Sequence, residues 1–218
     1  MQNGLFCIFC ILCCFAIVVT GCERQPSEQN QIKTEMAEIN DRNHTPLYRI
    51  RAPKNWVRRD PLPDEPLEDT RKAICEYFID DPEGLIRITI HNFPSKNILH
   101  RPLPLNHVNR WQHQFDENEC TESQILPQAF SGYQGLLFIG AGKVKQSPAM
   151  ILAWAMQLGP EHYQALKAFQ DDDNPYIQET ADVTIKAAGP IGPMEKHKAD
   201  IISMARSFEL IEEIPDPI

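Results

Sequence analysis

The chain has 218 residues, of which 42% are hydrophobic, and its formal net charge at pH 7 is −9. This length fits one globular domain with an extended lead in front of it. An acidic chain is poorly suited to bind nucleic acid, which requires basic surface to displace counterions from phosphates. The same acidity argues against a polybasic contact with a membrane.

The N-terminal segment is an apolar run without charged side chains from Gly4 to Gly21, followed directly by charged and polar residues. It ends in the sequence Val-Thr-Gly-Cys at residues 19–22, which resembles the lipobox of bacterial lipoproteins. In that motif small residues admit the chain to the signal peptidase, and the cysteine thiol receives the lipid. The sequence therefore predicts a signal peptide over residues 1–21 and lipidation, with palmitate among the acyl chains, at Cys22.

Two other interpretations of this segment remain open. A run of about 18 to 20 apolar residues could cross a bilayer as an uncleaved helix, and residues 1–3 lack the basic side chain that a signal peptide normally carries. A cysteine-rich segment could also be palmitoylated without cleavage. All three interpretations attach the chain to a membrane. The lipoprotein interpretation places the domain on the exported, periplasmic side of the cell membrane or the outer membrane.

The cysteines divide between the leader and the body. Four of the seven lie in the leader, and Cys22 is assigned to the lipid, so that only Cys75 and Cys120 remain. An oxidising envelope would allow these two to form a disulfide. Since sequence gives no distance between them, two separate buried thiols remain the alternative. Neither cysteine has a C-x-x-C partner, which excludes zinc-ribbon and thioredoxin-like sites.

The segment after the leader is predicted to be a flexible tether. Residues 22–46 are polar, with Ile32, Met36 and Ile39 as the only sizeable apolar residues. Their spacing would also suit a short amphipathic helix, but so little apolar surface would not stabilise it alone. The globular domain is expected over residues 47–218.

The first half of this domain is predicted to consist of strands. Residues 47–52 alternate apolar and basic side chains, as in a half-buried strand. Residues 71–79 and 85–93 predict a hairpin around a turn at 80–84. In the second of these strands, isoleucines at 86, 88 and 90 share one face, while Arg87, Thr89 and His91 share the other.

Helices are predicted in the second half. Asn106 can cap a helix that runs to about residue 117, with Val108, Trp111 and Phe115 on one stripe. A final amphipathic helix ends near Phe208. The remaining predicted elements are strands over residues 132–142, 149–158 and 181–187 and a short helix over 160–169.

Strands joined by tight turns, with helices inserted irregularly, favour an α+β fold built on an antiparallel sheet. The chain resembles the PsbP, Mog1 and DcrB group in the order of its motifs. These are YRIRAPKNW at 48–56, a strand pair, NRW at 109–111, AGP at 188–190 and ARSF at 205–208. The resemblance covers residues 47–210 and implies an α/β/α sandwich with a central antiparallel sheet. Many bacterial members of this group are lipoproteins. They act mostly as binding or assembly factors, so the resemblance implies no catalytic residue and no cofactor.

The residue patterns themselves predict no metal site. His107 and His113 are six positions apart, off one another's helix face, and are interpreted as solvated helix histidines. The three aspartates at 171–173 lack the glycine and distal glutamate of a calcium loop. The carboxylates in the turn at 80–83 are interpreted as solvated.

Catalytic motifs are absent from the sequence as well. The segment from Gly140 to Lys143 lacks the spacing of a phosphate loop and is interpreted as part of a strand and its turn. No G-x-S-x-G motif occurs in the chain. Trp56, Trp111 and Trp154 lie on apolar faces and are interpreted as core residues, although an aromatic ligand pocket among them remains open.

Two functions follow as hypotheses. The first is a lipid-anchored envelope protein, not an enzyme, whose domain binds a protein partner or assists assembly of an envelope complex. The second is an envelope small-ligand binder or hydrolase with a site between the sheet and a helix. A concave cavity with convergent polar groups and perturbed pKa values would favour the second. A filled interior with one exposed apolar patch would favour the first.

Overall fold

The structure is a computed structural model that describes residues 33–40, 46–61, 72–93, 98–116, 120–161 and 182–211. The predicted signal peptide, Cys22, the aspartates at 171–173 and most of the helix predicted over 160–169 lie outside these ranges. The described elements are β1 (Thr34–Asn40), β2 (Pro46–Pro53), β3 (Val57–Arg59), β4 (Cys75–Asp81), β5 (Gly84–Asn92), the 3-10 helix η1 (Ile98–His100), α1 (Pro104–Gln112), β6 (Cys120–Phe130), β7 (Tyr133–Val144), β8 (Ser147–Leu158), β9 (Asp182–Gly189), α4 (Ile191–Arg206) and β10 (Glu209–Leu210).

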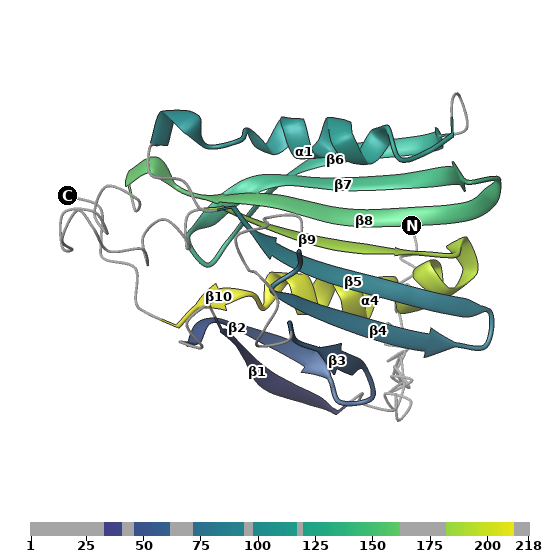
Figure 1. The fold of residues 1–218 in the computed structure, drawn as a ribbon, viewed down its shortest axis with the longest axis horizontal. Helices are drawn as coiled ribbons and strands as arrows, with labels where there is room; N and C mark the ends of the chain where they lie inside the picture. The colour runs from purple at the N-terminus through teal and green to yellow at the C-terminus, as the bar shows by residue number, and fades with distance from the viewer. Residues whose placement is uncertain are drawn as a thin grey trace, which may run out of the picture. The chain divides into compact units, whose positions relative to one another are not determined.

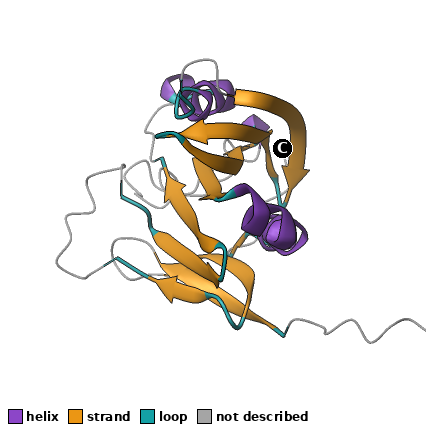
Figure 2. Ribbon diagram, turned by 90° about the vertical axis from the view of Figure 1, so that its right-hand side faces the viewer, coloured by secondary structure: helices purple, strands orange, loops and turns teal. Residues whose placement is uncertain are grey.

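The main sheet has seven strands in the order β3-β4-β5-β9-β8-β7-β6, and every pair of neighbours is antiparallel (Figure 1). Helix α1 packs against β7 and β8, and α4 packs against β5, β8 and β9. The apolar residues under the two helices alternate along the strands, so the helices cover opposite faces; Figure 2 shows the helices with strands between them. The predicted α+β fold with a central antiparallel sheet is therefore confirmed.

A second, small sheet corrects the predicted tether. Strand β1 pairs with β2, which also pairs with β10. Ile39 lies opposite Tyr48 and is fully buried in the core. The expectation of a flexible tether over residues 22–46 is thus wrong for residues 34–40, because pairing with β2 satisfies their backbone groups and gives Ile39 a core to enter. The ordered domain begins before residue 47.

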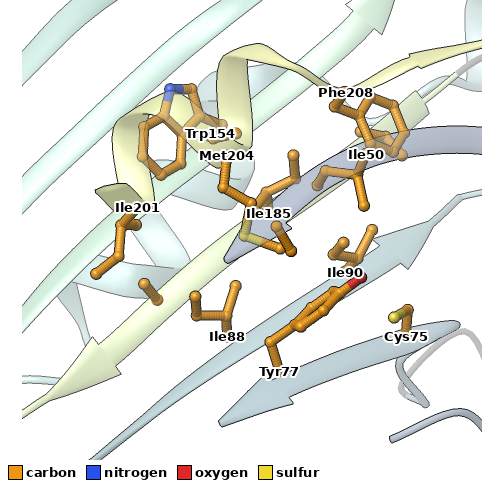
Figure 3. Packing of buried hydrophobic residues seen from close by; sticks show 14 of the residues in the cluster. Ile50, Cys75, Tyr77, Ile88, Ile90, Trp154, Ile185, Ile201, Met204 and Phe208 are labelled. Atoms are coloured by element: carbon orange, nitrogen blue, oxygen red, sulfur yellow. The ribbon is translucent and has the colours of Figure 1, made fainter. Parts of the chain in front are cut away.

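The larger part of the core lies between the main sheet and α4. Ile88 and Ile90 from β5, Ile185 from β9 and Trp154 from β8 face Met204 of α4 (Figure 3). The tryptophan indole is fully buried there. This face confirms the predicted apolar stripe of the hairpin strand and the amphipathic character predicted for the final helix.

A smaller cluster lies under α1 on the opposite face of the sheet. Val108, Trp111 and Phe115 pack on Phe138 of β7 and on short side chains such as Ala153 of β8. All three residues of the predicted stripe are buried here, but Phe115 follows the helix, which ends at Gln112 and not near residue 117. The predicted start at Asn106 is also wrong. The helix begins at Pro104, because proline fits the first turn, where no backbone N–H is required.

Strand β6 was not predicted from the sequence. Most of its eleven residues are exposed, so no apolar-polar alternation marks it. It forms the free edge of the sheet through its pairing with β7. Pro127, which has no backbone N–H, lies in its middle, as is typical of edge strands.

The two cysteines of the body do not form a disulfide. Cys75 lies on β4 and is buried, whereas Cys120 begins β6, and both are free thiols. Four strands lie between them, which at about 4.8 Å per strand is far beyond the roughly 7 Å that a disulfide can bridge. The alternative of two separate thiols is therefore correct, but only Cys75 of the two is buried.

A buried carboxylate joins the β4–β5 turn to α4. Asp81 accepts hydrogen bonds from Lys196 Nζ at 2.7 Å and from the Glu83 backbone N–H at 3.0 Å, and His197 Nε2 lies 3.2 Å from it. The hydrogen bonds from Lys196 and Glu83 lower the pKa of Asp81 from 3.8 to about 2. The expectation of solvated carboxylates in this turn is wrong for Asp81, since α4 packs over the turn.

Replacing Asp81 by asparagine is expected to lower the melting temperature at neutral pH and to weaken its acid dependence. Because the pKa of Asp81 is depressed in the folded state, its contribution to stability is present above pH 4 and is lost as the pH falls from about 4 to about 2. Thermal unfolding of both proteins across this pH range tests this. Equal slopes of melting temperature against pH would contradict it.

Candidate anion-binding site

Half of one sheet face is left uncovered by α1. The helix lies over β7 and β8, while the neighbouring strands β9, β5, β4 and β3 carry polar side chains on the same face. The strand register places Arg59, Glu76, Thr89 and Lys186 in one row across these strands, and Ala153 under α1 continues that row. The row therefore runs from the open sheet to the base of the helix.

A cavity of about 360 Å³ lies where this open face meets α1. Such a volume falls at the lower end of the range for small-molecule sites. Its walls are Arg87, Thr89, His91 and Phe93 from β5 and its end, Thr184 and Lys186 from β9, and Arg110, Trp111 and Gln114 from α1 and its end. Among the described residues, this lining contains three cationic side chains, Arg87, Arg110 and Lys186, and no carboxylate.

Two of these cations have only neutral partners in the described part of the chain. Lys186 Nζ donates a hydrogen bond to Gln114 Oε1 at 3.2 Å, and Arg110 Nη2 lies 3.3 Å from His107 Nδ1. Burial lowers the pKa of Lys186, and the positive charges of Arg110 and Arg87 lower it further. An anion in the cavity would relieve this repulsion.

The third cation is held by a buried carboxylate. Arg87 Nε donates to Glu76 Oε1 at 3.0 Å, its Nη2 contacts the same oxygen, and Arg59 Nη1 lies 3.8 Å from Glu76 Oε2. Glu76 also lines a second cavity of about 190 Å³, which shares Arg87 and His91 with the first. The two cavities therefore adjoin along the strands.

Aromatic rings form the wall beside the cations. The rings of Phe93 and His107 lie 4.6 Å apart, and His107 lies 6.1 Å from Trp111. Burial lowers the pKa of His107 to about 4, with Arg110 and His91 adding to the effect, so His107 is neutral at pH 7. His113 is exposed as expected, but the interpretation of His107 as solvated is wrong, because its helix face turns toward Phe93.

This arrangement is suited to binding. Within the described ranges, no three His, Cys, Asp or Glu side chains approach one another closely enough to hold a metal ion. Cys75 is buried, and its burial raises the pKa of its thiol to about 12, which disfavours the thiolate. The cavity between α1 and strands β5 and β9, called the groove below, places the positive charges of Arg87, Arg110 and Lys186 beside hydroxyl and aromatic groups. This combination recognises an anion.

The other positions considered from sequence lie elsewhere. Residues 140–143 belong to β7, as interpreted, and Trp56 and Trp154 belong to the core on the α4 side. Only Trp111 reaches the cavity. Among the residues that the structure describes, no helix is both long and apolar enough to span a membrane.

Sequence reasoning missed the cationic groove, although a signal for it was present. The alternation of β5 had already placed Arg87, Thr89 and His91 on one face. The same period in β9 places Thr184 and Lys186 together. A lysine in the middle of a strand with apolar neighbours on both sides, Ile185 and Ala187, was the local sign of a special position.

Comparison with solved structures finds similar chains. The chain is similar to the solution structure of cyanobacterial PsbP (CyanoP) from Synechocystis sp. PCC 6803, with 10% identity, a TM-score of 0.47, and coverage of 82% of this chain and 93% of that one. It is also similar to LpqN of Mycobacterium tuberculosis, a protein involved in cell envelope biogenesis, with 7% identity, a TM-score of 0.47, and coverage of 81% and 91%.

No protein-family model matches the chain, and the comparison with curated proteins gives no match. The residues that line the groove are therefore the basis for assigning a function.

Proposed function

We propose that this chain is a lipid-anchored protein of the cell envelope whose domain binds a small anionic ligand in the groove between α1 and strands β5 and β9, without catalysing a reaction on it. The proposal depends on one observation. Lys186 and Arg110 face a cavity without a carboxylate partner among the described residues, in a chain whose net charge is −9. Uncompensated, partly buried charges are unfavourable for folding, and a ligand that neutralises them explains their presence.

A protein partner is a second candidate function. Leu99, Leu103 and Leu105, at η1 and the start of α1, are 85%, 62% and 48% exposed. Large apolar side chains gathered in a short surface segment favour a protein contact. The groove is the stronger feature, because it combines a cavity, convergent polar groups and a perturbed lysine pKa.

Replacing Lys186 by methionine is expected to weaken anion binding about 30-fold or more, which corresponds to about 2 kcal/mol for loss of a buried charged contact. Isothermal titration with inorganic phosphate, citrate and benzoate measures this. The melting temperature of this variant should be about 2–4 °C above that of the unmodified protein, which corresponds to roughly 1 kcal/mol of stability. The reason is that the variant removes the repulsion between Lys186 and the two arginines, Arg110 and Arg87.

The matched control is Lys198→Met, which removes the same charge on α4, on the opposite face of the sheet. Its anion affinity should equal that of the unmodified protein. If none of the three anions binds, or if both methionine variants weaken binding equally, the groove is not the binding site.

The anchor is tested separately at Cys22. Replacing it by serine is expected to abolish acylation and to move the protein from the membrane to the soluble fraction of the envelope, since the acidic body offers little attraction of its own to anionic lipid. Radiolabelled palmitate, intact mass and fractionation measure this. A serine variant of full processed size that still partitions with the membrane would contradict the lipid anchor.

A further inference from the structure

We infer that the anion is a phosphate monoester of a small polyhydroxylated molecule, with its phosphate between Lys186, Arg110 and Arg87 and its hydroxyl groups in the adjoining cavity over Glu76. This inference rests on the proposed function and names the class of ligand for the same groove.

The charge of the groove indicates a dianion. Lys186 and Arg110 each lack a carboxylate partner in the described residues, so a monocarboxylate would leave one of the two uncompensated. A phosphate monoester carries about −1.5 to −2 charges at pH 7 and presents three acceptor oxygens. Arginine and lysine together with hydroxyl donors are the groups that bind such an oxyanion. Thr184, which carries a hydroxyl group, lines the same cavity.

The volume of the cavity indicates that phosphate does not fill it. At about 360 Å³ it exceeds several times the roughly 30 Å³ that one water occupies in the liquid. The second cavity adds about 190 Å³ and shares two wall residues, Arg87 and His91, with the first. A ligand that reaches past the side chains of Arg87 and His91 can therefore contact both cavities.

The second cavity is lined for hydroxyl groups. Asp60 and Glu76 supply carboxylate oxygens that accept hydrogen bonds, Arg59 and Lys72 supply donors, and only Pro61 and Ala73 are apolar. A hydroxyl group can serve both kinds of partner, because it donates and accepts. An acyl chain would replace water around these charged groups by hydrocarbon, which is unfavourable.

The test compares glucose 6-phosphate, inorganic phosphate and glucose by isothermal titration on the body carrying Cys22→Ser. Glucose 6-phosphate should bind about tenfold more tightly than phosphate, through added hydrogen bonds in the second cavity, and glucose should bind far more weakly than either. Equal affinities for glucose 6-phosphate and phosphate would overturn the assignment of a polyhydroxylated ligand while leaving anion binding intact. Failure of both phosphates, together with citrate and benzoate, would overturn the proposed function itself.

The variant Glu76→Gln is expected to change the affinities for glucose 6-phosphate and for inorganic phosphate in different ways, which separates the roles of the two cavities. Glu76→Gln removes the acceptor carboxylate and releases Arg87, so glucose 6-phosphate should lose its tenfold advantage while inorganic phosphate binds as well as before or better. Lys198→Gln is the control and should change neither affinity. A parallel loss of both ligands in Glu76→Gln would contradict the assignment.

The same phosphate chemistry occurs in lipid headgroups. Sedimentation with phosphatidylcholine vesicles that contain phosphatidic acid distinguishes this source. For a soluble ligand, we expect that the Cys22→Ser protein shows no vesicle binding that depends on Lys186. Binding to these vesicles that Lys186→Met abolishes, without binding of glucose 6-phosphate, would replace the soluble ligand by a lipid.

Discussion

Replacing Arg101 by methionine is expected to lower the free energy of unfolding by about 3–5 kcal/mol, the cost of leaving one member of a buried ion pair alone. Arg101 Nε and Nη2 donate to Asp182 Oδ1 at 2.9 and 2.6 Å, and Nη2 also donates to the Leu158 carbonyl at 2.9 Å. The two side chains are only 4% and 2% exposed. The pair fixes the chain after η1 to the start of β9 and the end of β8.

A double variant that replaces both Arg101 and Asp182 is expected to regain stability relative to the single variant, because both side chains are buried. Burial raises the pKa of Asp182, and Arg101 only partly opposes this, so the surroundings disfavour the charge even with its partner present. Arg101→Met combined with Asp182→Leu removes both charges together. Urea unfolding should show the single variant as the least stable of the three proteins. A double variant less stable than the single one would show that Arg101 acts through its bond to Leu158 and not through the ion pair.

Replacing Gly135 by alanine is expected to cost about 3 kcal/mol or more, or to prevent folding. An added Cβ would lie 1.9 Å from the Ala155 carbonyl oxygen and 3.0 Å from the Met156 Cα, both backbone atoms of β8. Gly135 pairs directly with Met156, so the clash would force β7 and β8 apart at this pair. Loss of this pairing would also disturb the surface on which α1 packs.

The comparison for this variant is Gly132→Asn in the β6–β7 turn. Gly132 is exposed and has a φ of 78°, a conformation that asparagine tolerates better than other residues. We expect it to cost about 1 kcal/mol or less. Chemical unfolding and circular dichroism check both variants. Equal stability of the two would mean that β7 can shift to accommodate a methyl group at position 135.

Strand β1 and strand β6 illustrate what local patterns cannot predict. Residues 34–40 contain one buried apolar side chain, Ile39, and most of β6 is exposed. Neither segment has an alternation of its own, because each is an edge strand whose pairing partner supplies most of its stabilisation. Hairpin β4–β5 was predictable for the opposite reason, since an apolar residue at every second position marks its buried face.

The ion pair of Asp81 with Lys196 and the separation of Cys75 from Cys120 depend on contacts between segments distant in the chain. An acidic turn looks solvated until a helix more than a hundred residues later packs over it. Two cysteines look like partners until the order of the strands is known.

Which side chains share a face of a strand can be read from the chain alone, because it depends only on the period of two: Arg87, Thr89 and His91 on β5, and Thr184 with Lys186 on β9. That β5 and β9 are neighbours, and that α1 stops short of them, follows from the folded arrangement of the strands and the helix. The packing of Trp111 and its neighbours on β7 and β8 fixes the position of α1, and that position brings Arg110 beside Lys186 at an open cavity. Such convergence depends on contacts between distant segments, which no local pattern contains.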